Sequence, residues 1–573
     1  MFLRLYAKGL YAKRSLAAIT LLTSALISSQ TAFAGDGDLG FAGSGGFGGF
    51  AYFLPGNLIV SRVVYDNNPK NVQVGQPLPP NCTGSNCVAA TANGAYPFVW
   101  NNALADGSFG ITATIFLDQV DLGGRFINSL EVPNGRQRQH GFGPAGDSMV
   151  GSFSSKSEDA LNLSTDGRFV TLMGYLAPVD AIDISNSNTP GVVDPTNPVP
   201  AQNFRIVAQV DALGRFHFTK TNAYSGNNGR AAILNDSGRV PLIYTAGNAG
   251  NGSNPQPNGV ILGAGAQILD ASKEPEASQA PGQPTPVGSF SVTQLGLKAD
   301  KVGKDTNFRG LTVFDNVVYL TKGSGGNGVN TVYFIDTSGF DGNGKPLACP
   351  NGTGVPRAAA GLPTAPISFN AANLQSQGVT PYNMCVLQGF PTNSAKSATL
   401  FPFGLWFANA KTLYVADEGN GTATFSGGRF TAAAAQTHAG LQKWVFNDAT
   451  GNWQLAYTLT AGLNLGVPYT VHGYPTGNNA ATGLPWSPAT DGLRNITGKV
   501  NPDGTATIWA ITSTVSGNGD QGADPNELVA ITDTLSATAL PATESFKTVR
   551  TAGFGEVLRG VSFTPRFREL SER

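Results

Sequence analysis

The sequence predicts an all-β protein, a β-propeller of six blades whose last blade is closed by strands from the N- and C-terminal ends of the chain. Three observations support this prediction: a strand phrase that recurs along the chain, chain ends that complement each other, and a composition suited to strands and tight turns. Glycine is abundant, with 73 residues, and charged residues make up 13% of the chain. Ordinary globular proteins contain about 25% charged residues.

The recurring phrase is a short apolar strand, a polar turn and a second strand. Recurrence at a roughly regular spacing is typical of repeat folds, in which each unit is one supersecondary element. A second hairpin-like pair follows each phrase, as in Leu441-Gln-Lys-Trp-Val-Phe and Trp453-Gln-Leu-Ala-Tyr-Thr-Leu. Two hairpins make a four-stranded blade. The phrase begins at Ala160, Arg230, Arg309, Phe403 and Arg494.

The two ends of the chain carry complementary parts of one further unit. Arg559-Gly-Val-Ser-Phe-Thr matches only the first strand of the phrase, and strands that begin near Asn57, Thr112 and Gly124 supply the rest. A blade built from both ends closes the ring and removes an exposed sheet edge. This count gives six blades, and long insertions could hide a seventh. A β-sandwich or a β-solenoid is the alternative fold, but a sandwich does not predict shared phrases and solenoid repeats are shorter.

Two features of the phrase give the chain a resemblance to a known group. Thr412-Leu-Tyr-Val-Ala-Asp and the Arg-Gly opening of the inner strand resemble secreted bacterial propellers of the broad lactonase-like and NHL-like kind. The resemblance covers nearly the whole mature chain and implies the propeller fold. Members of that group include hydrolases, lyases and binding proteins, so the resemblance does not decide the function.

The first 34 residues have the pattern of a signal peptide. Basic residues precede an apolar run, Leu16 to Ile27, and Thr31-Ala-Phe-Ala offers a cleavage site after Ala34. An uncleaved N-terminal anchor is the alternative. We therefore expect a secreted or periplasmic protein with no transmembrane segment after cleavage. The expected organisation is a signal peptide at 1–34, a glycine-rich flexible segment at 35–53, one propeller domain at 54–566 and a tail at 567–573.

Charge and cysteine content narrow the partners and the compartment. The formal net charge is -1 and blocks of Lys and Arg are absent, which argues against a nucleic-acid partner. The four cysteines of an exported chain favour disulfides, and we expect the pairs Cys82–Cys87 and Cys349–Cys385. Half of a zinc site at Cys82 and Cys87 is the alternative, but no histidine or further cysteine pair lies nearby in the sequence.

Arginine opens four of the predicted inner strands. Equivalent positions of a propeller lie on a ring around the central channel, so these guanidinium groups could converge near one mouth and bind a carboxylate or phosphate. Glu158 lies near the equivalent place in the first blade. The alternative is that arginine is a repeat residue that makes hydrogen bonds between blades. The four arginines are Arg230, Arg309, Arg494 and Arg559.

The remaining site candidates are weaker. His438 and His472 lie in predicted loops beside the outer hairpin of the fourth blade and could act as bases, whereas His217 is expected at the surface of a strand. The pair Asp417-Glu418 ends a strand of the fourth blade, where carboxylates could transfer protons or bind a cation. Successive strand residues point to opposite faces, which weakens that pair as a joint site.

Calcium is the one metal that the sequence suggests, and no other cofactor is evident. Asp520 and Asp524 lie in a glycine-rich loop with several oxygen ligands, the kind that hard cations prefer. Polar solvated turns also explain this loop. It does not match the helix-flanked calcium-loop pattern.

The sequence leaves two functions open. The first is an exported binding or interaction module with an unknown ligand or a protein or polysaccharide partner. The second is a hydrolase or lyase that acts on an anionic small molecule or sugar derivative at the channel mouth. The nucleophile elbow, zinc-protease helix and phosphate-binding loop motifs are all absent from the sequence.

Overall fold

The structure, a computed structural model, shows six β-sheets that form the six blades of a propeller. The fold prediction is therefore confirmed. The predicted signal peptide lies outside the residues that the structure describes, and the described residues all belong to one unit, Gly49–Arg136 with Gly143–Arg573. These residues are 52–78, 87–90, 110–134, 148–191, 202–248, 265–272, 291–292, 307–323, 328–343, 345–357, 361–364, 383–393, 398–519 and 521–567.

The first three blades follow one another along the chain. Blade one has the order β10-β9-β8-β7, with bounds Phe216–Thr221, Arg205–Asp211, Phe169–Tyr175 and Asn162–Leu163. Blade two has β11, β12 and β13 among the described residues, at Gly229–Asn235, Leu242–Gly247 and Ala266–Asp270. Blade three has the order β14-β19-β17-β16-β15, with β18 beside β19, at Ser291–Val292, Asn383–Leu387, Thr331–Asp336, Val317–Lys322, Leu311–Phe314 and Thr353–Gly354.

Blades four and five are regular four-stranded antiparallel sheets. Blade four has the order β20-β21-β24-β25, at Pro402–Asn409, Thr412–Asp417, Gly440–Asn447 and Asn452–Leu459. Its β21–β24 connection contains the hairpin β22–β23 and the short helix α3, at Phe425–Ser426, Arg429–Phe430 and Thr431–Ala434. Blade five has the order β26-β27-β28-β29, at Ala489–Val500, Thr505–Val515, Glu527–Thr534 and Lys547–Thr551.

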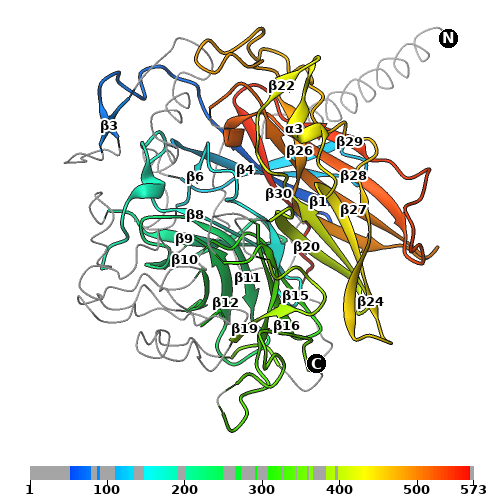
Figure 1. The fold of residues 1–573 in the computed structure, drawn as a ribbon. Coiled ribbons are helices and arrows are strands. Elements are labelled where there is room, and N and C mark those ends of the chain that lie inside the picture. The colour runs from blue at the N-terminus through cyan, green and yellow to red at the C-terminus, as the bar shows by residue number, and fades with distance from the viewer. Residues whose placement is uncertain are drawn as a thin grey trace, which may run out of the picture. The chain divides into compact units, whose positions relative to one another are not determined.

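Blade six joins the two ends of the described chain. Its order is β30-β1-β4-β5, with β6 beside β4, at Glu556–Phe563, Leu58–Val64, Thr112–Val120, Phe126–Glu131 and Gly151–Ser152. β1 pairs antiparallel with β30 on one side and with β4 on the other, and Leu58 faces Phe563. Figure 1 shows the blue β1 close to β30, although the two strands come from opposite ends of the described chain. The predicted closure by both chain ends is therefore confirmed.

The innermost strands form a closed ring. β7, β11, β15, β20, β26 and β30 each contact the next, and β30 contacts β7. Each blade packs between two neighbours, so its strands are apolar on both faces. β11 and β12, for example, are buried along their whole length. This two-sided burial explains the continuous apolar runs of the strand phrase.

The glycines of the inner strands have a steric role. A Cβ atom on Gly310 would lie 1.9 Å from the carbonyl oxygen of Phe403 in the next blade. A Cβ atom on Gly404 would lie 2.4 Å from the carbonyl oxygen of Arg494, and one on Gly560 would lie 2.4 Å from the amide nitrogen of Leu161. The Arg-Gly opening of the phrase therefore reflects a close approach of backbones between successive blades.

Gly310→Ala is expected to lower the free energy of unfolding by about 1–3 kcal/mol, because the added methyl group forces the two backbones apart. The matched control is Gly342→Ala, since a Cβ there has nothing within 4 Å. Denaturant unfolding of both variants would check this. Equal stability of the two variants would contradict the steric explanation.

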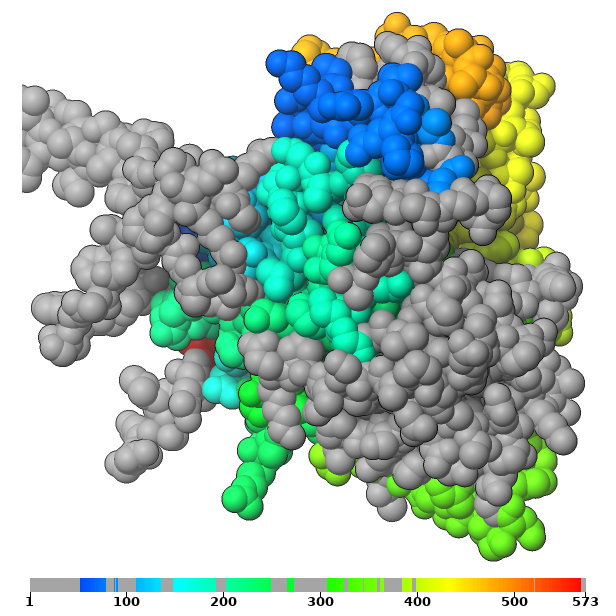
Figure 2. Space-filling model, turned by 90° about the vertical axis from the view of Figure 1, so that its left-hand side faces the viewer, coloured from blue at the N-terminus to red at the C-terminus, as the bar shows by residue number. Residues whose placement is uncertain are grey.

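Long connections between strands also pack together. Tyr65 and Val72, in the connection that follows β1, share a buried cluster with Val471, Tyr474 and Trp486, from the connection between β25 and β26. In Figure 2 the blue and orange surfaces of these connections lie at the same end of the molecule. The insertions that lengthen the repeat therefore join a buried cluster that also contains strand residues such as Ile59 and Leu172.

Candidate functional site

Two of the four predicted arginines bind the protein itself. Arg230 on β11 donates from Nη1 to the carbonyl oxygen of Phe308, at 2.8 Å, and to the side chain of Asn307. Arg559 on β30 donates from Nη2 to the carbonyl oxygen of Phe153. The partners belong to the start of the next blade or to the segment that follows blade six. For these two residues the structure favours the hydrogen-bonding role between blades.

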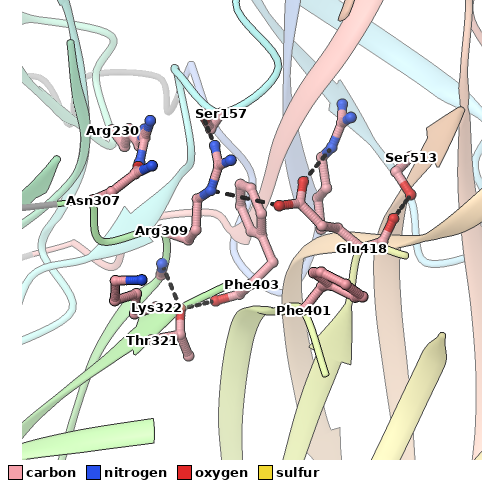
Figure 3. A network of polar contacts seen from close by, with 12 residues as sticks. Ser157, Arg230, Asn307, Arg309, Thr321, Lys322, Phe401, Phe403, Glu418 and Ser513 are labelled. Atoms are coloured by element: carbon pink, nitrogen blue, oxygen red, sulfur yellow. Dashed lines mark hydrogen bonds and ion pairs between the residues drawn. The ribbon is translucent and has the colours of Figure 1, made fainter. Parts of the chain in front are cut away.

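The other two arginines converge on one carboxylate. Arg309, just before β15, approaches Glu418 with Nε 3.5 Å from Oε1, and Arg494 on β26 approaches it with Nε 3.4 Å from Oε2. Figure 3 shows the Glu418 carboxylate directed toward the guanidinium group of Arg309. Glu418 directly follows β21, so blades three, four and five each contribute one member of this triad.

A cavity of about 250 Å³ opens at this triad. Several of its residues, among them Arg309, Glu418 and Ser513, come from the starts of inner strands and the ends of the adjacent second strands, which meet at one end of an antiparallel pair. The cavity therefore lies on one face of the ring. Its lining comprises Lys156, Arg309, Gly323, Asn330, Phe401, Glu418, Gly419, Asn420, Gly421, Asp491, Arg494, Ser513, Thr514 and Gln521.

Lys156 reaches the cavity from a segment that crosses between blades. This segment, 153–157, is part of the connection between β6 and β7. Ser155 Oγ accepts a hydrogen bond from the Asn228 amide of blade two at 2.9 Å, and Ser157 Oγ accepts one from Arg309 of blade three at 2.5 Å. These contacts fix the segment near the inner strands. It thus adds a cation that belongs to no strand of the repeat.

The cavity holds two carboxyl groups whose pKa values are shifted in opposite directions. Burial raises the pKa of Glu418, but the positive charges of Arg309, Arg494, Lys156 and Arg230 outweigh burial and hold that pKa below its usual range. Burial raises the pKa of Asp491 to about 6. These opposite shifts separate the pKa values of the two carboxyl groups, while both groups are ionised at pH 7.5.

Asp491 also fixes the rim of the cavity. Its Oδ2 accepts a hydrogen bond from the amide nitrogen of Gly421 at 2.8 Å, and its Oδ1 accepts one from Gln436 Nε2 at 2.5 Å. Gln436 Oε1 in turn accepts a hydrogen bond from the amide nitrogen of Asn420 at 2.8 Å. Asp491 therefore ties the β21–β24 connection of blade four to blade five.

Glu158 does not line this cavity. It is buried, and it accepts hydrogen bonds from the Tyr175 hydroxyl and from the amide nitrogen of Ser152, the latter at 3.1 Å. Burial raises its pKa, while the charge of Arg559 opposes that rise. Of the four predicted arginines, Glu158 therefore interacts with Arg559 and not with the two that face Glu418.

The histidines lie apart from the described cavity. His438, just before β24, is half-buried, and His472 is exposed; neither is among the lining residues. Their role as bases remains an untested prediction. His217 on β10 is exposed, as expected.

The calcium candidates remain untested. Asp520 lies outside the described residues, and Asp524 is buried. Asp524 Oδ1 accepts hydrogen bonds from the Tyr474 hydroxyl at 2.8 Å and the Ser516 hydroxyl at 3.0 Å. Among the described residues, His, Cys, Asp and Glu form no group of three or more that could bind a metal ion.

The structure bears out one disulfide. Cys349 and Cys385 are bonded, with 5.9 Å between their Cα atoms. Cys87 is also disulfide-bonded, whereas Cys82 lies outside the described residues. Within the described part of the chain no helix has the length and apolar character needed to span a membrane. A disulfide is compatible with a secreted or periplasmic location.

Among the charged residues of the cavity, sequence reasoning missed two. Lys156 lies in an irregular connection, where no periodic pattern marks it. Asp491 lies three residues before Arg494 in the same strand, and this proximity was the one available signal. Glu418 was noted only as half of an acidic pair. Asp417, its neighbour, accepts hydrogen bonds from the amide nitrogens of Phe401 and Gly419 at 2.8 and 2.9 Å and does not line the cavity.

Comparisons with known proteins show no family. No protein-family model and no characterised protein sequence matches the chain. Among solved structures, one of NanB plus Optactamide aligns with a TM-score of 0.30 and 8% identity over 72% of this chain and 62% of that chain. A polysaccharide lyase PL25, an ulvan lyase bound to -[GlcA(1-4)Rha3S]-, aligns with a TM-score of 0.28 and 11% identity over 87% of this chain and 96% of that chain. TM-scores this low carry no information about the site.

Proposed function

We propose that this protein is an exported binding module that holds a small anionic molecule in the cavity beside Glu418. The observation that carries the proposal is the excess of positive charge: Lys156, Arg309 and Arg494 line the cavity against the two carboxyl groups of Glu418 and Asp491. Guanidinium groups bind carboxylates and phosphates well in partly buried sites. Arg494 Nε makes no hydrogen bond among the described residues, and a bound anion would accept one from it.

The size and lining of the cavity favour a ligand no larger than about one sugar ring. Its volume, about 250 Å³, is below the 300 to 1,000 Å³ that is usual for drug-sized ligands. Phe401 offers an apolar face for a ring, and Asn420 and Gln521 offer amide groups to hydroxyls. A sugar acid fits this description better than an apolar acid.

One observation favours an enzymatic alternative. The cavity contains one carboxyl group with a lowered pKa, Glu418, and one with a pKa raised to about 6, Asp491. Carboxyl groups whose pKa values are pushed apart are typical of acid–base pairs. A hydrolase or lyase that acts on an anionic sugar derivative is therefore the second candidate. Formation of product during prolonged incubation with such a compound would support it.

The export part of the proposal rests on two features. The first residues combine basic residues with a short apolar run and a small-residue cleavage site. The bonded pair Cys349–Cys385 suits an oxidising compartment. Determination of the N-terminal residue of protein recovered from the cell envelope or medium would test cleavage after Ala34.

Sugar acids such as glucuronate and gluconate are expected to raise the melting temperature, whereas the matching neutral sugars are not, because only an anion balances the cavity charge. Lys156→Gln is expected to weaken sugar-acid binding about tenfold, or about 1.4 kcal/mol. The matched control is Lys499→Gln, since Lys499 is exposed at the far end of β26 and should not affect binding. Equal shifts with neutral sugars, or unchanged binding by Lys156→Gln, would contradict the proposal.

A further inference from the structure

The carboxylate of Glu418 is held more weakly than the rest of that residue. The backbone is fixed, because the amide nitrogen donates to the carbonyl oxygen of Phe401 at 3.0 Å and the carbonyl oxygen accepts from Ser513 Oγ at 2.5 Å. Within the described residues, by contrast, only ion pairs hold the carboxylate oxygens. Their Nε–O distances of 3.5 and 3.4 Å exceed the usual hydrogen-bond range of about 2.7–3.2 Å.

The guanidinium group of Arg494 retains donor capacity for another anion. Arg494 Nε is buried and makes no hydrogen bond among the described residues. A guanidinium group carries five N–H donors and binds a carboxylate best through two parallel hydrogen bonds. The 3.4 Å ion pair with Glu418 does not provide that geometry. A ligand carboxylate that did so would bind Arg494 better than Glu418 does.

Glu418 also sets the charge of the cavity. Among the described lining residues Lys156, Arg309 and Arg494 are positive and Glu418 and Asp491 are negative, which gives a net charge of about +1. This value matches a ligand with one negative charge. Without the charge of Glu418 the lining would be about +2, which matches a phosphate monoester, because such a group carries close to two negative charges above its second pKa of about 6.

We propose that Glu418 is the specificity-determining residue of this cavity, an internal counter-ion that an incoming anion displaces from Arg309 and Arg494 and that restricts the ligand to a single negative charge. The inference rests on the proposed function and names its ligand class as a monocarboxylate of one sugar ring. The displaced carboxylate competes with the ligand, so the wild-type affinity is lower than the arginine pair alone would give.

The test is calorimetric titration at pH 7.5 of wild type and Glu418→Gln with glucuronate and with glucose 6-phosphate. We expect wild type to prefer glucuronate, and Glu418→Gln to bind both compounds at least tenfold more tightly, with the larger gain for the phosphate ester. The matched control is Glu556→Gln, because Glu556 pairs with Arg62 in blade six and does not line the cavity. This control should bind as wild type does.

Other outcomes separate this inference from the proposed function. If wild type and Glu418→Gln both bind neither compound, the proposed function fails. If wild type binds glucuronate and Glu418→Gln binds it equally or more weakly, the inference alone is overturned, and Glu418 contacts the ligand instead. If Glu418→Gln does not fold, Glu418→Asp is the second variant. Its shorter side chain withdraws the carboxylate from both guanidinium groups, so it should also bind more tightly, and unchanged or weaker binding would overturn the inference.

Discussion

Lys443→Met is expected to lower the free energy of unfolding by about 3–5 kcal/mol, because it leaves a buried carboxylate without its cation. Lys443 on β24 and Asp533 on β28 have fully buried side chains, and Nζ lies 2.9 Å from Oδ2. The hydroxyl groups of Tyr414 and Tyr457 also donate to Asp533. This network joins blades four and five, so its loss should be measurable as a lower denaturant midpoint.

The same blade offers a matched control. Lys411 pairs with Asp448 at 2.6 Å, but the two side chains are 61% and 67% exposed. Lys411→Met should therefore cost less than about 1 kcal/mol, as exposed pairs generally do. If both methionine variants lost the same stability, burial would not be the reason for the effect.

Asp524→Asn is expected to make the protein more stable than wild type at pH 8, by about 2–4 kcal/mol, and to make little difference near pH 4. Burial raises the pKa of Asp524 to about 7, whereas an aspartate in an unfolded chain titrates near about 3.9. The folded state therefore retains its proton to a higher pH. The associated stability is complete below about pH 4 and is lost as the pH rises through about 7.

The side-chain contacts make asparagine a suitable replacement. Oδ1 accepts the hydrogen bonds from Tyr474 and Ser516, while Oδ2 is buried and makes no hydrogen bond among the described residues. An amide that keeps its oxygen at the Oδ1 position preserves both contacts and cannot ionise. Denaturant unfolding at pH 4, 6 and 8 would check the prediction. A stability difference that does not change with pH would show that packing rather than ionisation is responsible.

The strand phrase predicted the fold because every blade needs the same local features, namely strands buried on both faces and a close approach of backbones. A run such as Val317–Lys322 is buried along its whole length because each blade packs between two others. The Arg-Gly opening marks the close approach of Gly310 to Phe403. The match between Arg559 and the residues after Asn57 predicted the pairing of β30 with β1. The buried run and the Arg-Gly opening recur along the chain, so one sequence suffices to detect them.

The candidate site was only partly predictable. The repeat placed all four arginines on inner strands, but it could not distinguish Arg230, which donates to the carbonyl oxygen of Phe308, from Arg494, which faces Glu418. The four arginines occupy equivalent positions on the ring, but the connection between strands that lies next to each arginine differs from blade to blade. That connection decides the partner of each guanidinium group.

By itself the sequence determined the repeat and the closure by both chain ends, and it predicted six blades, with seven left open, and the pair Cys349–Cys385, because apolar periodicity, turn residues and cysteines reflect local demands on the chain. Only the tertiary structure decided which charges meet. Lys156, Glu418 and Asp491 are distant in the sequence and lie on an irregular connection, at a strand end and on an inner strand. Their convergence depends on how the blades pack around the ring, and no local pattern encodes a long-range electrostatic contact of that kind.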